Sequence, residues 1–540
     1  MKNMKGGGNV AEEKWEEAVK EEELREGVPV AVKLEKKNVL LVKTGGTVHA
    51  CGGKCTHYGV PLKDGVLLGH VLTCPGHNAR FDVSTGKAEA PPALENLAHY
   101  ETKVEKGKVF IRKAGKRASS AREPSTKGSA KNTETYIIVG AGAAGNAAAL
   151  TLRRNGYEGR LIMVTAESEL PYDRPNLSKD FITGEVKREW MSLGPPELYK
   201  NLQIEVWTGH KAINLDARNK TVSFAHESQI GFDKALLATG GIPRSPAITG
   251  TESPGFFLLR SLSDAEAILK NLEGAGEAVV IGSSFIGLEV AASLRTRNVA
   301  VHVVSPDAVP LARVFGERIG ARIRRIHEKR GVVFQLGVSV DEIAADGKGK
   351  TVKLSNGKSI PADIVIAGIG VVPAVTYLLD SGLVESGAVP VKGTLETKAE
   401  GIFAAGDIAI VPDPLSGKTR RIEHWVEAER QGRHAALAML GAKEPYAEVP
   451  FFWTKQYDTA LKYVGHAKSF DRVVYRGKVE EDDFIAGYYE KEKIQAAAGC
   501  GRSTDIILIG ELLKAGKGPS AAQLEDGGVA LHDLLRMKPD

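Results

Sequence analysis

Two similar segments constrain the fold of this chain of 540 residues more than any other feature of its sequence. Each begins with a short apolar stretch, passes through closely spaced glycine or small residues, and continues into an alanine-rich stretch. The segments are TYIIVGAGAAGNAAAL, from Thr135, and EAVVIGSSFIGLEVAASL, from Glu277. This order is typical of a strand, a phosphate-binding turn and a helix in doubly wound α/β folds. We therefore predict two nucleotide-binding units of one kind.

The first segment places Gly140, Gly142 and Gly145 in the spacing G-x-G-x-x-G. Such glycines permit a tight turn and let a pyrophosphate approach the helix N-terminus, although the spacing alone is weak evidence. Close helix packing is the competing explanation, and it does not explain why the glycines stop where the helix begins. Ala166 occupies the usual place of the ribose-binding acid after the next strand, so we predict that its neighbour Glu167 binds the ribose.

The second segment has Gly282, Ser284 and Gly287 in the same spacing, and serine is still small enough for close approach. At the end of the following strand, Ser305 stands where an acid would favour NAD by accepting a hydrogen bond from the ribose 2′-hydroxyl. The sequence therefore leaves both NADH and NADPH open.

Three further stretches fit the same scheme. LLATGG, ending at Gly241, and AGIGVVP, ending at Pro373, are typical of the returns between two nucleotide-binding domains. GIFAAGDIA places Asp407 after a glycine near a predicted helix start, where it suits a ribityl or pyrophosphate contact. A glycine turn with a capping aspartate is the alternative interpretation.

A second constellation lies nearer the N-terminus, where Cys55, His57, Cys74 and His77 occur on two glycine-rich loops. Four soft or borderline ligands in two pairs predict a metal site. Zinc would take all four in one tetrahedral site. The spacing C-x-H and C-x-x-H, within CTHYG and CPGHNARFDVSTGK, closely resembles the cluster loops of Rieske ferredoxins. In a Rieske cluster both cysteines bind one iron and both histidines bind the other.

Short alternating strands and turn glycines surround these loops, so residues 25–115 predict a small all-β domain. Residues 11–26 are charged and amphipathic and predict a helix before it. Residues 116–133 are rich in serine, alanine, lysine and arginine and predict a flexible linker. Such a tether would keep the all-β module at a high effective concentration beside the rest of the chain.

The composition excludes several classes of function. A formal net charge of +5 is small for this length, so no nucleic-acid partner is expected. No apolar run approaches the length of a membrane span, and the N-terminus lacks the apolar core of a secretory signal. Four cysteines, two of them in a ligand pattern, do not make a disulfide framework, so we expect a cytoplasmic protein. Cys51 and Cys500 are expected to be core residues.

From Thr135 onward, the stretches LPYDRPNLSK, GSSFIGLEVAA, GIFAAGDIA and VPFFWTKQYD resemble those of pyridine-nucleotide-dependent flavoprotein reductases. More narrowly, the chain resembles the oxygenase-type ferredoxin reductases and, with its Rieske module, the apoptosis-inducing-factor 3-like, Rieske-fused branch. The resemblance implies a multidomain fold: an all-β Rieske [2Fe-2S] domain, doubly wound α/β FAD and NAD(P) domains, and a C-terminal α+β interface domain. The implied limits are 1–24 for an N-terminal extension, 25–115 for the Rieske domain, 116–133 for the linker, 134–252 and 380–447 for the FAD domain, 253–379 for the NAD(P) domain, and 448–540 for the interface domain.

The same resemblance implies roles for single residues. Lys179 would lie near the reactive edge of the flavin, where a cation stabilises the reduced form, and Glu289 would face the nicotinamide and pair with Lys179. We predict that these two form the catalytic pair; without the resemblance, a surface lysine and a solvated helix glutamate would be the simpler interpretations. Trp453 would lie beside the flavin, and the helix that follows His424 would point its N-terminus at the pyrimidine side.

The predicted FAD contacts are Gly140, Gly142, Ala143, Ala144, Gly145, Glu167, Arg174, Lys179, Ala238, Thr239, Gly240, Asp407, Glu423, His424, Trp425 and Trp453. The predicted NAD(P)H contacts are Gly282, Ser284, Phe285, Ile286, Gly287, Glu289, Gly368, Ile369 and Gly370.

Four departures from high-potential Rieske proteins bear on the redox potential. Val60 and Gly76 occupy the positions of an extra cysteine pair, and Ala79 and Phe81 stand near positions that carry hydroxyls beside the sulfurs. Fewer hydrogen bonds to the cluster stabilise its reduced form less, so we predict a potential of roughly −150 mV.

The predicted protein is an oxidoreductase that passes electrons from NAD(P)H through FAD to the Rieske cluster and on to an unknown acceptor protein, such as an oxygenase or P450. The reductase part contains no C-x-x-C, which excludes the disulfide-reductase route. His424 and His434 lack the spacing of a mononuclear iron site, so a complete oxygenase is not expected. The alternatives are an apoptosis-inducing-factor-like signalling flavoprotein and a reductase of quinones or oxygen. We keep a homodimer open.

Overall fold

The computed structural model describes residues 15–34, 37–113, 133–226, 228–346, 349–414 and 416–536. The chain divides into two compact units, Met1–Glu123 and Pro124–Asp540. The predicted linker lies outside the described residues, apart from Thr133. Within the described ranges, no helix is long and apolar enough to cross a membrane.

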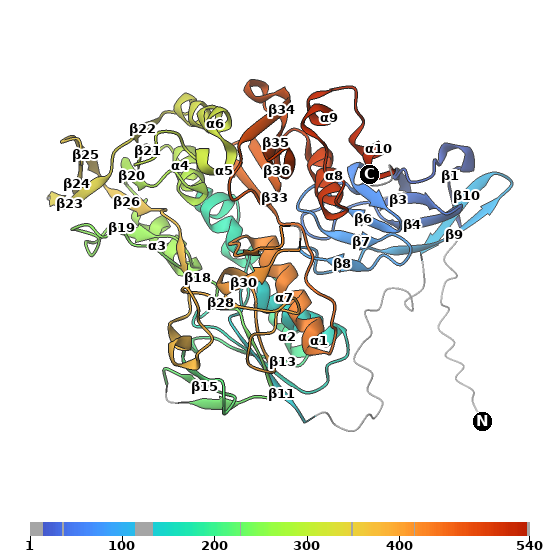
Figure 1. The fold of residues 1–540 in the computed structure, drawn as a ribbon, viewed down its shortest axis with the longest axis horizontal. Coiled ribbons are helices and arrows are strands. Elements are labelled where there is room, and N and C mark those ends of the chain that lie inside the picture. Colours follow the sequence, from blue (N-terminus) through green and yellow to red (C-terminus); the bar gives the residue numbers. More distant parts are fainter. Residues whose placement is uncertain are drawn as a thin grey trace, which may run out of the picture. The chain divides into compact units, whose positions relative to one another are not determined.

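The first unit is an all-β domain of two antiparallel sheets, as predicted (Figure 1). The larger sheet has the order β1-β10-β9-β4-β3-β2, with strands Glu16–Lys20, Lys108–Lys113, His99–Glu105, Thr47–Gly52, Lys37–Thr44 and Val30–Leu34. The smaller sheet has the order β5-β6-β7-β8, with strands Val66–Leu68, Val71–Thr73, Arg80–Asp82 and Ala88–Ala90. Two 3-10 helices, η1 (Glu21–Glu23) and η2 (Leu62–Asp64), complete this unit.

Strand β3 is buried on both faces, which accounts for its unbroken apolar run. Val39 packs in one hydrophobic core and Leu40 in the other. The second of these cores also contains Cys55 and Cys74. The two predicted cysteine ligands therefore rest on packed apolar side chains, which hold their loops in place.

The predicted N-terminal helix is wrong over its described part. Residues 16–20 form β1, which pairs antiparallel with β10, and only one 3-10 turn follows. Without β1, one side of β10 would carry unpaired backbone groups, and Lys108 Nζ lies 2.9 Å from a carboxylate oxygen of Glu17. Tertiary pairing thus overrides the helix propensity of these residues. Residues 11–14 lie outside the described ranges.

The second unit contains two parallel five-stranded sheets, the arrangement that the repeated glycine segments predict. The first has the order β13-β12-β11-β17-β29, with strands Ile204–Trp207, Arg160–Val164, Thr135–Val139, Lys234–Leu237 and Ile402–Ala404. The second has the order β19-β26-β20-β21-β22, with strands Phe256–Leu258, Ile364–Ala367, Glu277–Ile281, Ala300–Ser305 and Val332–Leu336. The strand that leads into a glycine segment, β11 or β20, lies at the centre of each sheet.

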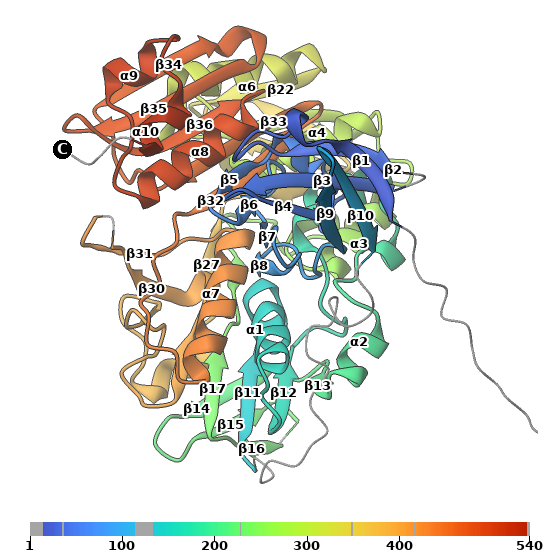
Figure 2. The ribbon, with the colours of Figure 1, turned by 90° about the vertical axis from the view of Figure 1, so that its right-hand side faces the viewer.

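Helices follow both central strands. α1 (Ala143–Arg154) follows β11, α4 (Phe285–Thr296) follows β20, and α7 (Trp425–Met439) lies beside α1 (Figures 1 and 2). Gly432 of α7 permits this close approach, because a Cβ atom there would lie 2.0 Å from the carbonyl oxygen of Ala144. Other helical segments of this part are α2 (Pro196–Asn201), α3 (Leu262–Asn271), α5 (Ala312–Phe315), α6 (Glu317–Lys329), η3 (Arg174–Asn176), η4 (Leu177–Phe181), η5 (Arg188–Trp190), η6 (Thr376–Ser381) and η7 (Gly406–Ile408).

Antiparallel strands accompany the two parallel sheets. Two three-stranded meanders are β14 (Ala212–Asp216), β15 (Thr221–Phe224) and β16 (Gln229–Gly231), and β23 (Val340–Asp346), β24 (Gly349–Leu354) and β25 (Ser359–Ala362). The returns that the sequence predicts pair with each other as β18 (Gly241–Pro243) and β27 (Val371–Pro373). Strands β28 (Val389–Pro390), β30 (Ala409–Pro412) and β31 (Thr419–Arg420) form another small sheet.

The chain ends in an antiparallel sheet with helices, as the α+β prediction requires. The order is β32-β33-β36-β35-β34, with strands Phe451–Gln456, Thr459–Gly465, Lys493–Cys500, Asp483–Glu490 and Arg472–Lys478. The helices here are η8 (Val479–Glu481), α8 (Ser503–Lys514), α9 (Ala521–Glu525) and α10 (Leu531–Arg536). One hydrophobic core contains both Leu288 of α4 and Phe452 of β32, so this sheet and the second parallel sheet are packed together.

Candidate functional site

The two predicted cysteine–histidine pairs lie on two loops of the first unit. A backbone hydrogen bond from each cysteine nitrogen closes its loop, at 2.9 Å for Cys55 and 2.8 Å for Cys74. The cysteine side chains are buried, with exposed fractions of 3% and 1%, whereas His57 and His77 are half-buried. The sulfurs therefore face the core, and the imidazoles lie nearer the surface.

The four side chains are grouped thiol with thiol and imidazole with imidazole. The Nδ1 atoms of His57 and His77 lie 3.2 Å apart. A hydrogen bond with Cys74, together with burial, raises the pKa of the Cys55 thiol. Within the described ranges, no group of three or more His, Cys, Asp or Glu residues converges on one metal position. The pairing suits a two-iron cluster, which takes two cysteines on one iron and two histidines on the other, better than a single tetrahedral zinc.

The departures from other Rieske loops have a structural basis. A Cβ atom on Gly76 would lie 3.0 Å from Cγ2 of Val60, so the two positions of the extra cysteine pair face each other here. Asn78 has a φ of 65°, a left-handed conformation that asparagine adopts more readily than most side chains. Ala79 and Phe81 are completely buried and bring no hydroxyl to the sulfurs.

The other two cysteines belong to the protein interior. Burial raises the pKa of Cys51 to about 12 and that of Cys500 to about 11. Thiols with such pKa values are inert near neutral pH, as expected for core residues.

In the first glycine segment, a side chain at either of two glycine positions would collide with the backbone. Gly140 has a φ of 113°, and a Cβ atom there would lie 2.2 Å from the carbonyl oxygen of Ala238. A Cβ atom on Gly145 would lie 1.8 Å from the carbonyl oxygen of Gly140. No atom lies within 4 Å of the Cβ position of Gly142, so the space beside that residue is open. This is the cradle that a pyrophosphate at a helix N-terminus requires.

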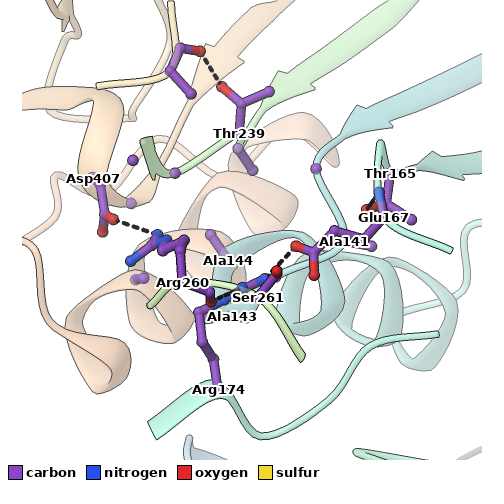
Figure 3. Close-up of a pocket in the computed structure, with 18 of the residues that line it drawn as sticks. Ala141, Ala143, Ala144, Thr165, Glu167, Arg174, Thr239, Arg260, Ser261 and Asp407 are labelled. Carbon is purple, nitrogen blue, oxygen red and sulfur yellow. Dashed lines mark hydrogen bonds and ion pairs between the residues drawn. The ribbon is translucent and has the colours of Figure 1, made fainter. Parts of the chain in front are cut away.

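A cavity of about 650 Å³ opens beside this turn (Figure 3). Its volume lies within the range of cofactor pockets. The predicted residues that line it are Gly140, Gly142, Ala143, Ala144, Glu167, Arg174, Lys179, Ala238, Thr239, Gly240, Ile286, Glu289, Asp407, Glu423, His424 and Trp425. Among the described residues, the lining does not include Gly145 or Trp453, so their contact with a cofactor stays a prediction.

Two guanidinium groups cross the cavity, each paired with a carboxylate (Figure 3). Arg174 donates to Glu167 at 2.6 Å, and Arg260 donates to Asp407 at 2.9 Å. Tyr172 donates to the second oxygen of Glu167 at 2.6 Å. Guanidinium groups suit a pyrophosphate, and carboxylates suit ribose or ribityl hydroxyls.

Sequence reasoning missed Arg260 as a site residue. The available signal was its place next to Ser261, which caps α3 and begins a capping box with Asp264. An arginine between a strand and the start of the next helix can reach a bound nucleotide. Single arginines are common at such places, so this signal alone does not identify a site residue.

The predicted catalytic pair is formed in the structure. Lys179 Nζ lies 2.8 Å from Oε2 of Glu289, with exposed side-chain fractions of 13% and 5%. Lys179 interrupts η4, where its φ of −120° and ψ of −112° are not helical. Ser178 donates to the same carboxylate oxygen at 2.6 Å, and Thr454 donates to the other oxygen at 2.6 Å. Thr454 lies within VPFFWTKQYD, one of the stretches that carry the family resemblance, but nothing in that stretch points to a contact with Glu289.

The second glycine segment forms a compact junction. Gly282 has a φ of 104°, and Ser284 caps α4 while its hydroxyl donates to the carbonyl oxygen of Gly368 at 2.5 Å. A Cβ atom on Gly368 would lie 2.9 Å from the nitrogen of Gly287. Ser305, at the end of β21, is buried and accepts a hydrogen bond from Ser283.

Three further predicted contacts, Phe285, Ile369 and Gly370, belong to the segments that meet at this junction, where Ile369 Cγ2 would lie 3.1 Å from a Cβ atom on Gly282. Phe285 begins α4, with its ring 5.1 Å from that of Phe452, and Gly370 has a φ of 95° just after Ile369. The predicted NAD(P)H residues are thus brought together around the start of α4.

The N-terminus of α7 borders the cavity through Glu423, His424 and Trp425. The ring of His424 stacks on Phe452 with 4.2 Å between centroids. Burial, helped by His466, lowers the pKa of His424 to about 3, so the imidazole is neutral at physiological pH. A neutral ring leaves the helix N-terminus as the positive pole at this place.

Comparison with known proteins agrees with the fold. The profile described as "Pyridine nucleotide-disulphide oxidoreductase" matches residues 134–432, "Rieske [2Fe-2S] domain" matches 14–101, and "Reductase C-terminal" matches 451–535.

Individual relatives match either more than nine tenths of the chain or about three quarters of it. Apoptosis-inducing factor 3 of Homo sapiens is 36% identical over 93% of this chain and 84% of its own length. The ferredoxin–NAD(+) reductase component of the biphenyl dioxygenase system of Paraburkholderia xenovorans is 32% identical over 75% of this chain and 100% of its own. The solved structure of a covalent putidaredoxin reductase–putidaredoxin complex is similar with a TM-score of 0.71 and 29% identity, over 75% of this chain and 98% of that one.

Proposed function

Because the chain belongs to the pyridine nucleotide-disulphide oxidoreductase family and carries a Rieske [2Fe-2S] domain, we propose that it is an NAD(P)H-dependent reductase with an internal electron relay. It transfers electrons from NAD(P)H through FAD to its own Rieske cluster, and from there to a separate redox protein. The observation that carries this proposal is that one chain holds both a dinucleotide cradle ending at a buried lysine–glutamate pair and two loops with paired thiols and imidazoles.

We assign the cavity to FAD. Gly140 and Gly142 leave room for the pyrophosphate at the start of α1, and Arg174 and Arg260 supply its counter-charges. Glu167 is the acceptor for the ribose hydroxyls. Each guanidinium is already paired with a carboxylate, Arg174 with Glu167 and Arg260 with Asp407. Both also belong to the lining that would face the phosphates.

We assign the junction at the start of α4 to the nicotinamide dinucleotide. Glu289 projects from this helix into the lining of the cavity, so its carboxylate reaches both proposed nucleotide sites. Lys179 brings a cation to the flavin side of that carboxylate. The pair thereby orients the two reacting rings and compensates negative charge at one of them.

Bound FAD would accept a hydride from NAD(P)H and release single electrons, and the [2Fe-2S] cluster would carry them one at a time. Cys55, Cys74, His57 and His77 are the residues that would hold the cluster, and the half-buried imidazoles give its histidine side access to a partner. We propose that the partner is a one-electron carrier or an oxygenase or P450. Three relatives are named as ferredoxin–NAD(+) reductase components of dioxygenase systems.

The test is anaerobic reduction of the purified protein by NADH and, separately, by NADPH. We expect bleaching of the flavin absorbance followed by the EPR signal of a reduced Rieske cluster. A cluster that stays oxidised while the flavin is reduced, or zinc in place of iron, contradicts the proposal. Turnover with ferricyanide distinguishes the reductase from the signalling flavoprotein. Fast reduction of ferricyanide supports the reductase. Slow turnover with a long-lived complex of reduced flavin and nicotinamide would favour the signalling flavoprotein.

A further inference from the structure

The carboxylate of Glu289 receives hydrogen bonds from two different parts of the second unit. Its Oε2 atom accepts from Ser178 at 2.6 Å and lies 2.8 Å from Lys179 Nζ, and both residues belong to η4. Its Oε1 atom accepts from Thr454 of β32 at 2.6 Å. The donors of η4 therefore hold Oε2, and the donor of β32 holds Oε1. With Oε2 held by η4, Thr454 determines the rotation of the carboxylate plane about the Cγ–Cδ bond of Glu289.

Thr454 is itself held by a chain of side chains within the same buried layer. Gln456 Nε2 donates to the Thr454 hydroxyl oxygen at 3.4 Å, and Gln456 Oε1 contacts Nε2 of His327 on α6. The exposed fractions of Thr454, Gln456 and His327 are 1%, 1% and 0%. Alternate residues of a strand face the same side, so Thr454 and Gln456 both point at α4 and α6.

These hydrogen bonds form a series that ends at the Glu289 carboxylate, and this end determines the direction of each of them. An ionised carboxylate can only accept, so the Thr454 hydroxyl donates to Glu289 and must accept from Gln456. The Gln456 oxygen then accepts from His327, whose proton therefore sits on Nε2. The Nδ1 atom of His327 is buried without a hydrogen-bond partner, as this tautomer allows. All donors thus point toward Glu289.

We propose that Thr454, supported by Gln456 and His327, is a positioning residue that holds the Glu289 carboxylate toward Lys179 and the nicotinamide. This inference rests on the proposed function. It gives the C-terminal sheet a part in the reaction, because β32 supplies the donor that η4 does not. If only η4 held the carboxylate, its contacts would be to Oε2 alone. The carboxylate could then rotate with Oε2 as the fixed point, and Oε1 would move away from its position in the site.

The test compares Thr454→Val, which keeps the shape and removes the donor, with Thr454→Ser, which restores the hydroxyl. Thr397→Val is the matched control, since Thr397 is also 1% exposed and donates to a backbone oxygen, that of Ala399. All are studied as the full chain with cofactors bound. Three quantities are measured: the rate of flavin reduction by NADPH or NADH in stopped flow, the dissociation constant of NAD(P)⁺ from an absorbance titration, and the pH profile of the reduction rate.

We expect Thr454→Val to slow flavin reduction by about ten-fold or more and to move the acid limb of the pH profile upward by about one unit, since a donor to a carboxylate is lost. Thr454→Ser and Thr397→Val should stay within about two-fold of the unmodified chain, because each keeps the donor to Glu289. Thr454→Val and Thr397→Val should have similar flavin content and melting temperature.

The positioning role is refuted if Thr454→Val matches Thr397→Val in rate, dissociation constant and pH profile, or if serine fails to restore them. Should Thr454→Val lose its flavin, Gln456→Leu provides the second test, with a smaller effect of the same sign expected and no effect refuting the role. A failure of the unmodified chain to be reduced by either nucleotide is a different result, which contradicts the proposed function.

Discussion

The close packing of α1 against α7 makes Gly432 a sensitive position outside the glycine segments. A Cβ atom on Gly432 would lie 2.0 Å from the carbonyl oxygen of Ala144, whereas ordinary contact begins at 3.4 Å. In Gly432→Ala the two helices must therefore separate locally by about 1.4 Å, the difference between these two distances. Ala144 lies in the first turn of α1 and lines the cavity, so the separation displaces the proposed pyrophosphate cradle.

Overpacking of this kind costs about 1–3 kcal/mol, which corresponds to a drop of roughly 2–12 °C in the thermal transition of a domain of about 150–250 residues. The assay follows flavin fluorescence during heating, together with the ratio of flavin to protein after purification. We expect a lower release temperature and substoichiometric flavin. Gly527→Ala is the control, since no atom lies within 4 Å of its Cβ position. An alanine variant at Gly432 with full flavin content and an unchanged transition would refute this account of the helix contact.

Four further predictions follow from other contacts. Lys179→Met leaves Glu289 without its cation, and breaking a buried pair costs about 3–5 kcal/mol; stopped-flow reduction should slow strongly, and a normal rate would contradict the role of the pair. Cys55→Ala should abolish the Rieske EPR signal while NAD(P)H still bleaches the flavin, whereas Cys51→Ala should keep both signals. Arg260→Gln should weaken FAD binding by about ten-fold or more, since it removes a charged donor; equal affinity in a flavin titration would remove Arg260 from the site. Burial lowers the pKa of His327 to about 4, so the unfolded chain, with a pKa near 6.5, takes up this proton first as the pH falls. Stability should thus decrease between pH 6.5 and 4, by about 2 kcal/mol at pH 5, and a melting temperature whose pH dependence is unchanged in His327→Gln would contradict this.

The parts of the fold that follow from local chemistry were predictable. The strands at Thr135–Val139 and Glu277–Ile281 are continuous apolar runs that end in glycine, and such runs have few alternatives. The strands of the C-terminal sheet are likewise visible as alternating and aromatic stretches. The four proposed cluster ligands could be named from the sequence because two short motifs hold all four side chains.

The unpredicted parts depend on contacts between distant segments. Glu16–Lys20 forms a strand only because β10 is there to pair with it. Thr454 approaches Glu289 across a separation of 165 residues in the sequence, and its place in VPFFWTKQYD does not reveal that contact. The family resemblance implies that Trp453, on the opposite side of the same strand, lies beside the flavin, but Trp453 is not among the described residues that line the cavity.

The antiparallel pair β18–β27 has a consequence for how this enzyme is built. The chain leaves the first parallel sheet through β18 and comes back through β27, and the two strands are hydrogen-bonded along their length. Everything between them, including the whole second sheet, is therefore an insertion with a narrow two-stranded stalk. Because the inserted body also shares a hydrophobic core with the C-terminal sheet, any rotation about this stalk would have to carry that sheet with it.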